Sequence, residues 1–405
     1  MRIAVVGAGV IGLVSAVRLR AAGHAVTLIA PELSESLSAA TAAEFANAGA
    51  SHAAAGMLAP LGETQFSQDG LAAALDAAAL AYPDLIDLLA TFTDAPAGYR
   101  AEGAWIVAAD PADARTWSPV LDHAALRGRR VEPVSARALR RAEPALAPGL
   151  HAGFDAPDDH QVDPRRLLGA CLSALVSTAG PDGAPLPAGS GPSAQGVRAR
   201  VESIEQDGER VVLNAVLPDG APQRLAADAA VLAAGLGHPQ ITGAPAAQPV
   251  ALRPVHGEVL RLRVRPEQLL PGESHLLTRT VRALVHGRQI YIVPRDGGGL
   301  VVGASSREDG SAATQAGAVL DLLADAAAVL PAVRECVLEE VLTRARPGSP
   351  DDAPRVLALD DAPRVVVANA FHRHGILLAP WAAEQILDRL AVHDHPTPDR
   401  QEQHA

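Results

Sequence analysis

Three glycines near the start of the chain, Gly7, Gly9 and Gly12, have the spacing Gly-x-Gly-x-x-Gly and directly follow a short apolar run. In a strand–turn–helix unit the first permits a tight turn, the second lets the backbone approach a pyrophosphate, and the third allows close helix–strand packing. The helix N-terminus then presents free N–H groups and a positive dipole end to phosphates. The spacing therefore predicts dinucleotide binding, with Val10 and Ile11 among the binding residues.

The elements around these glycines form the first part of a dinucleotide-binding unit. Residues 2–6 are an apolar run typical of a buried strand, residues 13–22 form a helical stretch that ends at Gly23, and residues 25–29 are a second apolar run. Strand, turn, helix and strand in succession are the opening βαβ unit of a Rossmann-like fold. We therefore predict an α/β protein that holds its cofactor near the N-terminus.

The ribose of such a cofactor is usually held by an acidic residue at the end of the second strand. That position is Ala30, and Glu32 follows two residues later. Glu32 reaches the ribose if the strand end bends; alternatively it is a solvated surface residue, and the sequence leaves both options open. No basic residue stands there to hold a 2′-phosphate, which disfavours NADP.

The rest of the chain alternates between helical and strand-like segments. Asp163-Pro164 has the pattern of an N-cap followed by proline in the first helical turn. We expect further helices at residues 71–89, 317–330 and 376–392, and strands at 105–108, 197–204, 211–217, 229–233, 255–264, 282–285, 289–293, 300–302 and 364–367. Leucines 260 and 262 alternate with arginines, which predicts a half-exposed antiparallel sheet.

Composition excludes several classes of function. The 405 residues are 48% hydrophobic and carry a net charge of −12, which argues against nucleic-acid binding. Two cysteines, Cys171 and Cys336, exclude a four-thiolate metal site. All 34 basic residues are arginine, so no lysine can form a Schiff base or serve as a general base.

Metal and membrane signals are weak. The 14 histidines form no His-x-x-x-His pattern on a helix and no cluster with carboxylates at ligand spacing, so we expect no metal. His372 and His374 read as polar loop residues. The long uncharged stretches are interrupted by Gly, Pro or Asn, so we expect no membrane contact and a cytoplasmic protein.

Together with the glycine motif, several blocks in a fixed order resemble the D-amino-acid oxidase family of flavoenzymes, and within it the glycine oxidase branch of thiamine biosynthesis. The blocks are residues 51–60 (SHAAAGMLAP), 160–165 (HQVDPR), 231–235 (VLAAG), 253–258 (RPVHGE), 291–295 (YIVPR), 300–304 (LVVGA), 346–348 (RPG) and 373–380 (RHGILLAP). The resemblance spans nearly the whole chain. It implies a Rossmann-like FAD-binding domain with an interleaved antiparallel-sheet substrate domain.

The resemblance also implies the residues of the site. Arg346 would bind a substrate carboxylate and Tyr291 would donate a hydrogen bond to it; without the resemblance we would read them as a surface ion-pair residue and a packing residue. Arg373 would either bond the flavin or shape the pocket. Besides the glycine turn and Glu32, the implied cofactor contacts are Ala54, Ala55, Gly56, Met57, Val201, Gly235, Arg373, Gly375, Ile376 and Leu377. Since no cysteine lies in a flavin-side motif, we expect FAD to be bound non-covalently.

The activity implied is FAD-dependent oxidative deamination of a small amino acid. Glycine is the first candidate, with sarcosine or small D-amino acids next; O2 is the electron acceptor, and the products are the 2-oxo acid, ammonia and hydrogen peroxide. No acid–base residue is required, because the neutral amine gives its α-hydride to the flavin and the imine hydrolyses in water. Two alternatives stay open: an oxidase or dehydrogenase of another secondary amine or imino acid, and a degenerate flavin-binding protein without activity.

Four positions depart from the family pattern, and they leave the substrate open. Ala30 lacks the ribose carboxylate, residues 368–370 read Ala-Asn-Ala where Ala-Thr-Gly is usual, and Phe371-His372 replaces a histidine followed by an aromatic. Residues 304–306 read Ala-Ser-Ser where the branch can carry a methionine. The absence of lysine argues against the sarcosine oxidase branch.

The expected domains are discontinuous in sequence. Residues 1–75, 150–250 and 335–395 are assigned to the FAD-binding domain, residues 76–149 and 251–334 to the substrate-binding domain, and residues 396–405 to a flexible tail. The family resemblance further implies a homo-oligomer.

Overall fold

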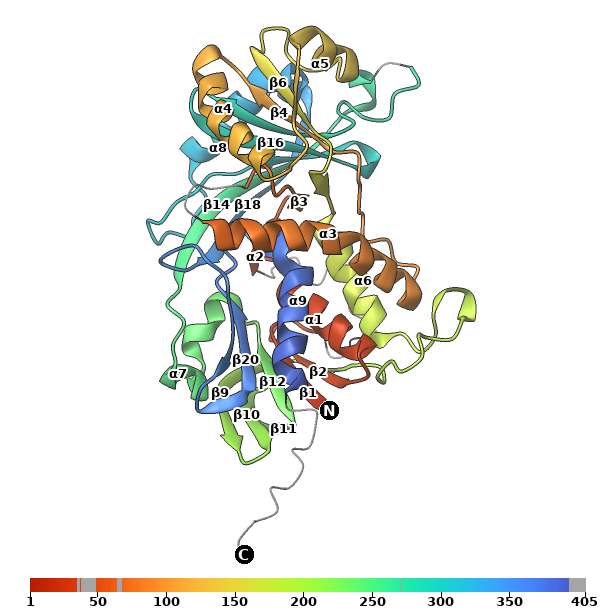
Figure 1. Ribbon diagram of the computed structural model, residues 1–405, viewed down its shortest axis with the longest axis vertical. Helices are drawn as coiled ribbons and strands as arrows, with labels where there is room; N and C mark the ends of the chain where they lie inside the picture. Colours follow the sequence, from red (N-terminus) through yellow and green to blue (C-terminus); the bar gives the residue numbers. More distant parts are fainter. Residues whose placement is uncertain (35–36, 38–48, 64–67, 270, 393–405) are drawn as a thin grey trace, which may run out of the picture.

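The computed structural model describes residues 1–34, 37, 49–63, 68–269 and 271–392. Figure 1 shows two units stacked along the long axis, with helix α3 (Asp69–Phe92) crossing the molecule between them. We call them the parallel-sheet unit, which holds the N-terminus, and the eight-stranded unit. The predicted flexible tail, residues 396–405, lies outside the described residues.

A six-stranded sheet forms the centre of the parallel-sheet unit, in the order β19-β20-β12-β1-β2-β8. Its strands are β1 (Arg2–Val6), β2 (Ala25–Ile29), β8 (Gln195–Val197), β12 (Ala229–Leu232), β19 (Arg355–Leu359) and β20 (Ala362–Asn369). All neighbours pair in parallel except β19 and β20, which are antiparallel. The predicted opening βαβ unit is confirmed, and the helix α1 (Val10–Ala21) begins directly after Gly9.

A smaller sheet covers one face of the parallel sheet, in the order β11-β10-β9-β13, with β11, β10 and β9 antiparallel and β13 parallel to β9. It contains β9 (Arg200–Asp207), β10 (Arg210–Val216), β11 (Pro222–Ala227) and β13 (Thr242–Gly243). The strand predicted at 197–204 is in fact two strands, because β8 pairs with β2 whereas β9 pairs with β10. A continuous apolar run does not reveal that the chain changes sheets within it.

The eight-stranded sheet runs in the order β18-β14-β17-β16-β15-β4-β6-β5. Its strands are β4 (Ala104–Ala108), β5 (Glu132–Val134), β6 (Ala152–Ala156), β14 (Arg253–Arg263), β15 (Thr280–Val285), β16 (Arg288–Arg295), β17 (Gly299–Gly303) and β18 (Val337–Gly348). Strand pairing places β6 and β18 here, whereas the sequence ranges 150–250 and 335–395 grouped them with the other unit. Apolar periodicity shows that a strand exists but not which sheet it joins.

Helices cover the other face of the parallel sheet and the outside of the eight-stranded sheet (Figure 1). Besides α1 and α3 they are α4 (Pro111–Leu126), α5 (Ala136–Ala142), α6 (Pro164–Val176), α8 (Ala316–Val329) and α9 (Gly375–Ala391). The short helix α2 (Gly49–Ala53) packs against β18 and α6, and α7 (Ala244–Ala247) packs against β9 and β13 of the smaller sheet. The predicted cap of α6 is confirmed: the Asp163 side chain accepts hydrogen bonds from Arg165 N at 3.0 Å and Arg166 N at 3.4 Å.

Short elements complete the chain. A two-stranded ribbon joins β3 (Met57–Leu58) to β7 (His160–Gln161). The 3₁₀ turns are η3 (Pro181–Gly183), η4 (Gly235–Gln240), η5 (Pro266–Gln268), η6 (Asp296–Gly298), η7 (Pro331–Glu335) and η8 (His372–His374). The Tyr82 hydroxyl on α3 donates a 3.0 Å hydrogen bond to Ile376 O and so ties α3 to the start of α9.

The prediction of a half-exposed strand at residues 260–264 is wrong at its first arginine. Arg261 is only 9% exposed, and Leu260 and Leu262 on either side of it are buried as well. The Arg261 guanidinium reaches α2 and donates a hydrogen bond from Nη2 to His52 O at 3.4 Å. Both faces of β14 are therefore covered at residues 260–262, although arginine alternates with leucine there. Within residues 260–264, Arg263 is the one that is exposed to solvent.

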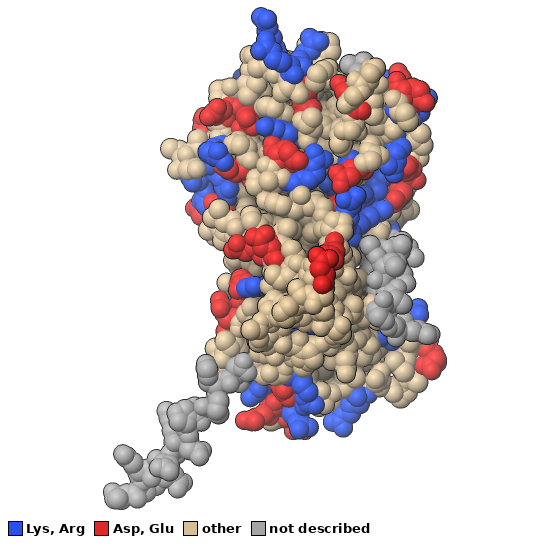
Figure 2. All heavy atoms as spheres, turned by 90° about the vertical axis from the view of Figure 1, so that its right-hand side faces the viewer, with Lys and Arg blue, Asp and Glu red and all other residues tan. Residues whose placement is uncertain are grey.

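The surface carries both signs of charge. Over the upper half of the face in Figure 2, arginines and acidic residues lie beside one another. Ion pairs between such residues include Arg130–Asp158 and Arg166–Asp296. Within the described residues, no helix combines the length and the apolar character that crossing a bilayer requires.

Candidate active site

A cavity of about 670 Å³ lies where the two units meet. The glycine turn, α2, η4 and η8 line it from the parallel-sheet unit, and β14, β16 and β18 line it from the eight-stranded unit. Its lining includes the sequence-predicted residues Gly7, Gly9, Val10, Ile11, Glu32, Ala54, Ala55, Gly56, Met57, Val201, Gly235, Tyr291, Arg346, Arg373, Gly375, Ile376 and Leu377. Segments that are far apart in sequence thus meet around one space.

Gly12 is the predicted site residue that does not line this cavity. A Cβ at Gly12 would stand 2.0 Å from Gly7 O, so its absence lets α1 pack against the turn. Gly7 has a φ of +107°, and a Cβ there would stand 2.4 Å from Ala233 O. Both glycines are therefore required by the backbone itself, as the motif predicts.

The first turn of α1 presents N–H groups that have no partner within the helix itself. Gly9 is the N-cap and supplies no side-chain cap. Val10 N donates to Ser51 Oγ at 3.1 Å, a contact that the sequence did not reveal. Helix N-termini without a cap bind phosphate groups through these donors and the helix dipole.

Further observations test whether a dinucleotide fits. Gly235 has a φ of +52°, and a Cβ there would meet no protein atom within 4 Å, so a side chain would project into the cavity. Ala30 is buried at the end of β2, whereas Glu32 is exposed and lines the cavity. The residues present therefore fit FAD: a helix N-terminus suited to phosphate at α1, a carboxylate on the cavity wall, and glycine where a side chain would obstruct.

The segment 54–57 is held by Arg295, a residue that the sequence did not single out as part of the site. Arg295 donates to Ala55 O and to Gln161 Oε1, and burial lowers the pKa of Arg295 to about 10. Gly56 has a φ of +72°, and a Cβ there would stand 2.0 Å from Val162 O. Backbone hydrogen bonds and close packing thus fix this segment against the cavity.

The C-terminal motif turns sharply between β20 and α9. Asn369 Nδ2 donates to Gly235 O at 2.9 Å, joining the two glycine-rich turns. Ala370 is buried with a φ of +63°. A non-glycine residue in this left-handed region costs about 1 kcal/mol, so the departure at Ala370 adds strain while the turn is kept. Gly375 then starts α9, whose first turn faces the cavity.

At the other end of the cavity, two glycines make room for the predicted substrate residues. A Cβ at Gly257 would lie 2.7 Å from Arg346 Nη1, and one at Gly303 would lie 2.3 Å from the Tyr291 hydroxyl. Arg346 has a 3.4 Å contact from Nη1 to Ser305 O. Burial lowers the pKa of Arg346, and burial raises the pKa of Tyr291. The guanidinium stays charged and the phenol stays protonated at neutral pH.

Glu63 organises the cations beside this site. Its carboxylate lies 2.7 Å from Arg282 Nη1, 2.7 Å from Arg373 Nε and 3.2 Å from His374 Nε2. Although burial alone would raise it, the charges of Arg373 and Arg282 hold the pKa of Glu63 well below its usual range. Sequence reasoning missed Glu63 and Arg282, because no local motif marks a contact across 219 positions.

The histidines that read as loop residues also line the cavity. His372 Nδ1 lies 3.3 Å from Asp352 Oδ1, and His374 contacts Glu63. Burial lowers the pKa of His372 to about 4, against the opposing effect of Asp352. Both imidazoles thus belong to the candidate site.

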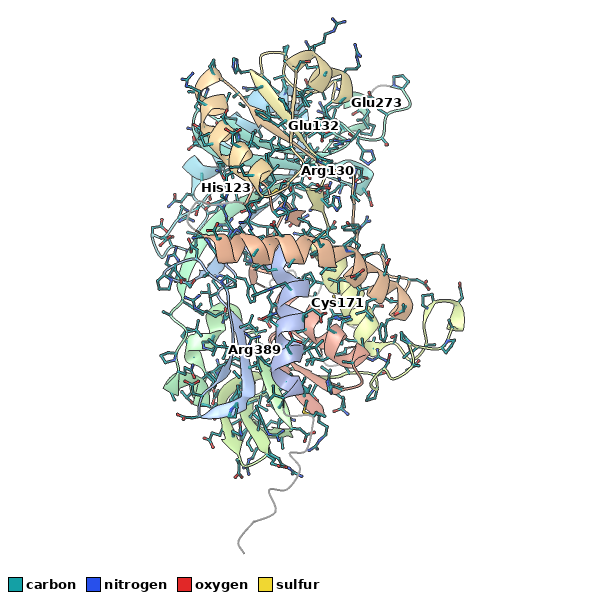
Figure 3. All side chains as sticks on the ribbon, viewed as in Figure 1. His123, Arg130, Glu132, Cys171, Glu273 and Arg389 are labelled. Carbon is teal, nitrogen blue, oxygen red and sulfur yellow. The ribbon has the colours of Figure 1, made fainter. Side chains whose placement is uncertain are left out.

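Neither cysteine is part of the cavity lining that the described residues form. Cys171 is buried on α6, within the helical layer of the parallel-sheet unit (Figure 3). Burial raises the pKa of its thiol to about 12, which makes it unreactive. Cys171 is therefore a core residue rather than a reactive thiol.

Comparison with known proteins agrees with this geometry. The chain is 30% identical over 387 residues to the bifunctional protein ThiO/ThiG of Synechocystis, a match that covers 95% of this chain and 50% of that protein. It thus spans about half the length of this relative. Glycine oxidase of Bacillus licheniformis is 33% identical over 115 residues, covering 28% of this chain and 30% of that enzyme.

Among solved structures, glycine oxidase from Geobacillus kaustophilus superposes with a TM-score of 0.79 and 26% identity, covering 96% of this chain and 95% of that one. The model of the FAD dependent oxidoreductase family, DAO, matches residues 2–389. The predicted family, its α/β fold and its class as an oxidoreductase are confirmed. The chain therefore belongs to the DAO family of FAD-dependent oxidoreductases.

Proposed function

We propose that this protein catalyses the oxidative deamination of a small amino acid, glycine first, to the 2-oxo acid, ammonia and hydrogen peroxide. The observation that carries the proposal is the pairing of Arg346 with Tyr291 in the cavity that also holds the glycine turn. A guanidinium beside a phenol suits a carboxylate, and the shared cavity brings that carboxylate to the cofactor. Relatives named glycine oxidase support the substrate class.

FAD would be held non-covalently by the glycine turn, segment 54–57, Gly235 and the first turn of α9. When bound, it supplies the two-electron acceptor that oxidation of an amine requires. No protein group needs to remove the α-hydrogen as a proton, so the work of the chain is to bind and orient the substrate.

Arg346 provides this orientation. Its guanidinium can receive a carboxylate through two parallel hydrogen bonds, which fixes both position and rotation of a small amino acid. The Tyr291 hydroxyl adds a third donor from β16, two strands away from β18 with β14 and β17 between them. Because the substrate is small, three donors at one end leave its α-carbon little freedom.

Glu63 and the surrounding arginines keep this arrangement in place. One carboxylate oxygen of Glu63 pairs with Arg373, and the other pairs with Arg282 of β15. A carboxylate shared between two guanidiniums restrains both and reduces their mutual repulsion. Arg373 thus shapes the wall of the substrate end.

A second candidate is oxidation of a larger secondary amine or imino acid. The small side chains of Ala304, Ser305 and Ser306 line the cavity beside Tyr291. They leave space for an N-substituent that bulkier residues would exclude. A panel containing both glycine and N-substituted amino acids separates the two candidates.

The decisive experiment uses the purified protein loaded with FAD. Anaerobic addition of glycine should bleach the flavin absorption, and admission of air should restore it with one equivalent of peroxide. Persistence of the oxidised spectrum with every small amino acid in the panel would contradict the proposal. Bleaching by an N-substituted substrate alone would favour the second candidate.

A further inference from the structure

An imidazole at the substrate end of the cavity is held from behind by a carboxylate. His372 belongs to η8 and lines the cavity, with Nδ1 3.3 Å from Asp352 Oδ1. Arg253, the first residue of β14, donates to the same Oδ1 from Nη1 at 3.0 Å and from Nη2 at 2.9 Å. The contacts from Arg253 to Asp352 and from Asp352 to His372 therefore hold the imidazole ring from its Nδ1 side.

This arrangement determines which ring nitrogen can accept a hydrogen bond. A carboxylate has only acceptor atoms, so its position next to Nδ1 favours the tautomer with hydrogen on Nδ1. Nε2 then carries the lone pair. Within the part of the chain that the structure describes, no residue hydrogen-bonds to Nε2 of His372, and the 3.3 Å approach of Asp352 to Nδ1 is an electrostatic contact rather than a hydrogen bond. Because burial lowers the pKa of His372 to about 4, the ring is neutral at pH 7.

The surrounding side chains supply mostly donors. Arg346, Arg373 and Arg282 have no acceptor atoms. Both oxygens of Glu63 already have partners: one accepts a hydrogen bond from Arg282, and the other lies at ion-pair distance from Arg373 and His374 without accepting a hydrogen bond from either. An amino acid brings a carboxylate that suits these donors, but it also brings an amino group whose N–H bonds need acceptors.

We propose that Nε2 of His372 accepts a hydrogen bond from the amino group of the substrate, and that Asp352 is a positioning residue for this contact. The inference rests on the proposed function and adds a determinant of specificity to it. Arg346 recognises the carboxylate, and His372 recognises the amine. The contact explains why an imidazole with a dedicated carboxylate stands in the cavity wall.

The test compares a ligand that has an amino group with one that lacks it. For the FAD-loaded enzyme, KM for glycine and Ki for acetate as a competitive inhibitor are measured in His372→Phe, His372→Gln and Asp352→Asn. The matched control is His151→Gln, an exposed histidine of the eight-stranded unit. Binding of acetate depends on the carboxylate donors and not on His372.

His372→Phe should raise KM for glycine about tenfold, the lower range for a hydrogen bond to a charged group, while Ki for acetate stays within twofold. His372→Gln should recover part of the loss, because its amide oxygen can accept. Asp352→Asn should raise KM by a smaller factor, since it removes the charge that fixes the tautomer. His151→Gln should match the wild type.

Parallel rises in KM and Ki would show that the ring only shapes the cavity, and an unchanged KM would show no contact; either result overturns the inference and leaves the proposed function intact. A wild-type enzyme that forms no peroxide with any small amino acid defeats the proposed function, and the inference with it. If His372→Phe does not fold, His372→Gln and Asp352→Asn decide the question through the same two constants.

Discussion

Replacing Arg346 by methionine tests the carboxylate clamp most directly. Methionine is unbranched and fills the space of the arginine stem, but it offers no donor. Two charge-assisted hydrogen bonds contribute about 1.5–3 kcal/mol each, so their joint loss amounts to about 3–6 kcal/mol. This converts to a fall in kcat/KM of roughly a hundred- to ten-thousand-fold.

The same change should leave the fold intact. Among the described residues the Arg346 guanidinium makes one long hydrogen bond, to Ser305 O, and burial disfavours its charge, so removing the guanidinium removes a desolvation cost. The melting temperature and the affinity for FAD should therefore stay at wild-type values. Arg263→Met on the neighbouring strand is the control, because its ion pair with Glu339 is exposed and contributes little.

The assay follows peroxide formation with glycine at several concentrations, alongside flavin titration and thermal unfolding. A loss of activity with FAD binding unchanged supports the clamp. If kcat/KM of Arg346→Met stays within threefold of wild type, Arg346 does not bind the substrate and the reasoning fails. A parallel loss of FAD would instead indicate that Arg346 supports the cofactor.

Three further outcomes follow from the geometry. Gly12→Ala should lower the melting temperature strongly, since its Cβ would stand 2.0 Å from Gly7 O, whereas Gly235→Ala should lower that of the apoprotein only by the strain of about 1 kcal/mol at its φ of +52° and should weaken FAD binding in a flavin titration. Tyr291→Phe should lower kcat/KM about tenfold with unfolding unchanged, and an unchanged kcat/KM would remove the hydroxyl from the site. Burial raises the pKa of Asp159 to about 7, so its stabilising protonated form is present below the unfolded pKa of 3.8 and is lost as pH rises through 7. Asp159→Asn should therefore stabilise the protein in denaturant melts at pH 8 more than at pH 5, and the opposite trend would contradict the assignment.

Sequence alone predicted the parts of the site that depend on local backbone geometry. The glycine turn was predictable because each glycine answers a steric demand within a few residues, as Gly7 and Gly12 show. Arg346 and Tyr291 came from the family resemblance, since an arginine or a tyrosine on a strand has no distinguishing local pattern. Both kinds of residue line the same cavity, apart from Gly12.

Contacts across the fold could not be predicted in this way. Glu63 contacts Arg282, which lies 219 positions further along the chain. Asp352 follows β18, whereas its partner His372 follows β20, so the two residues come from the ends of different sheets. Likewise β18 reads as a strand, but its pairing with β14 rather than with the parallel sheet depends on tertiary packing. Periodicity predicts elements, and only the assembled sheets determine which side chains become neighbours.

The cavity wall combines Gly7 near the first strand with Leu377 in the last helix. During synthesis at 5–20 residues per second, the intervening stretch of about 370 residues takes roughly 20–70 s to appear. The phosphate turn therefore waits for most of translation before α9 can complete the binding surface. FAD binding thus requires the complete binding surface, including α9. Chains that end before α9 should therefore bind no flavin and should be more sensitive to proteolysis.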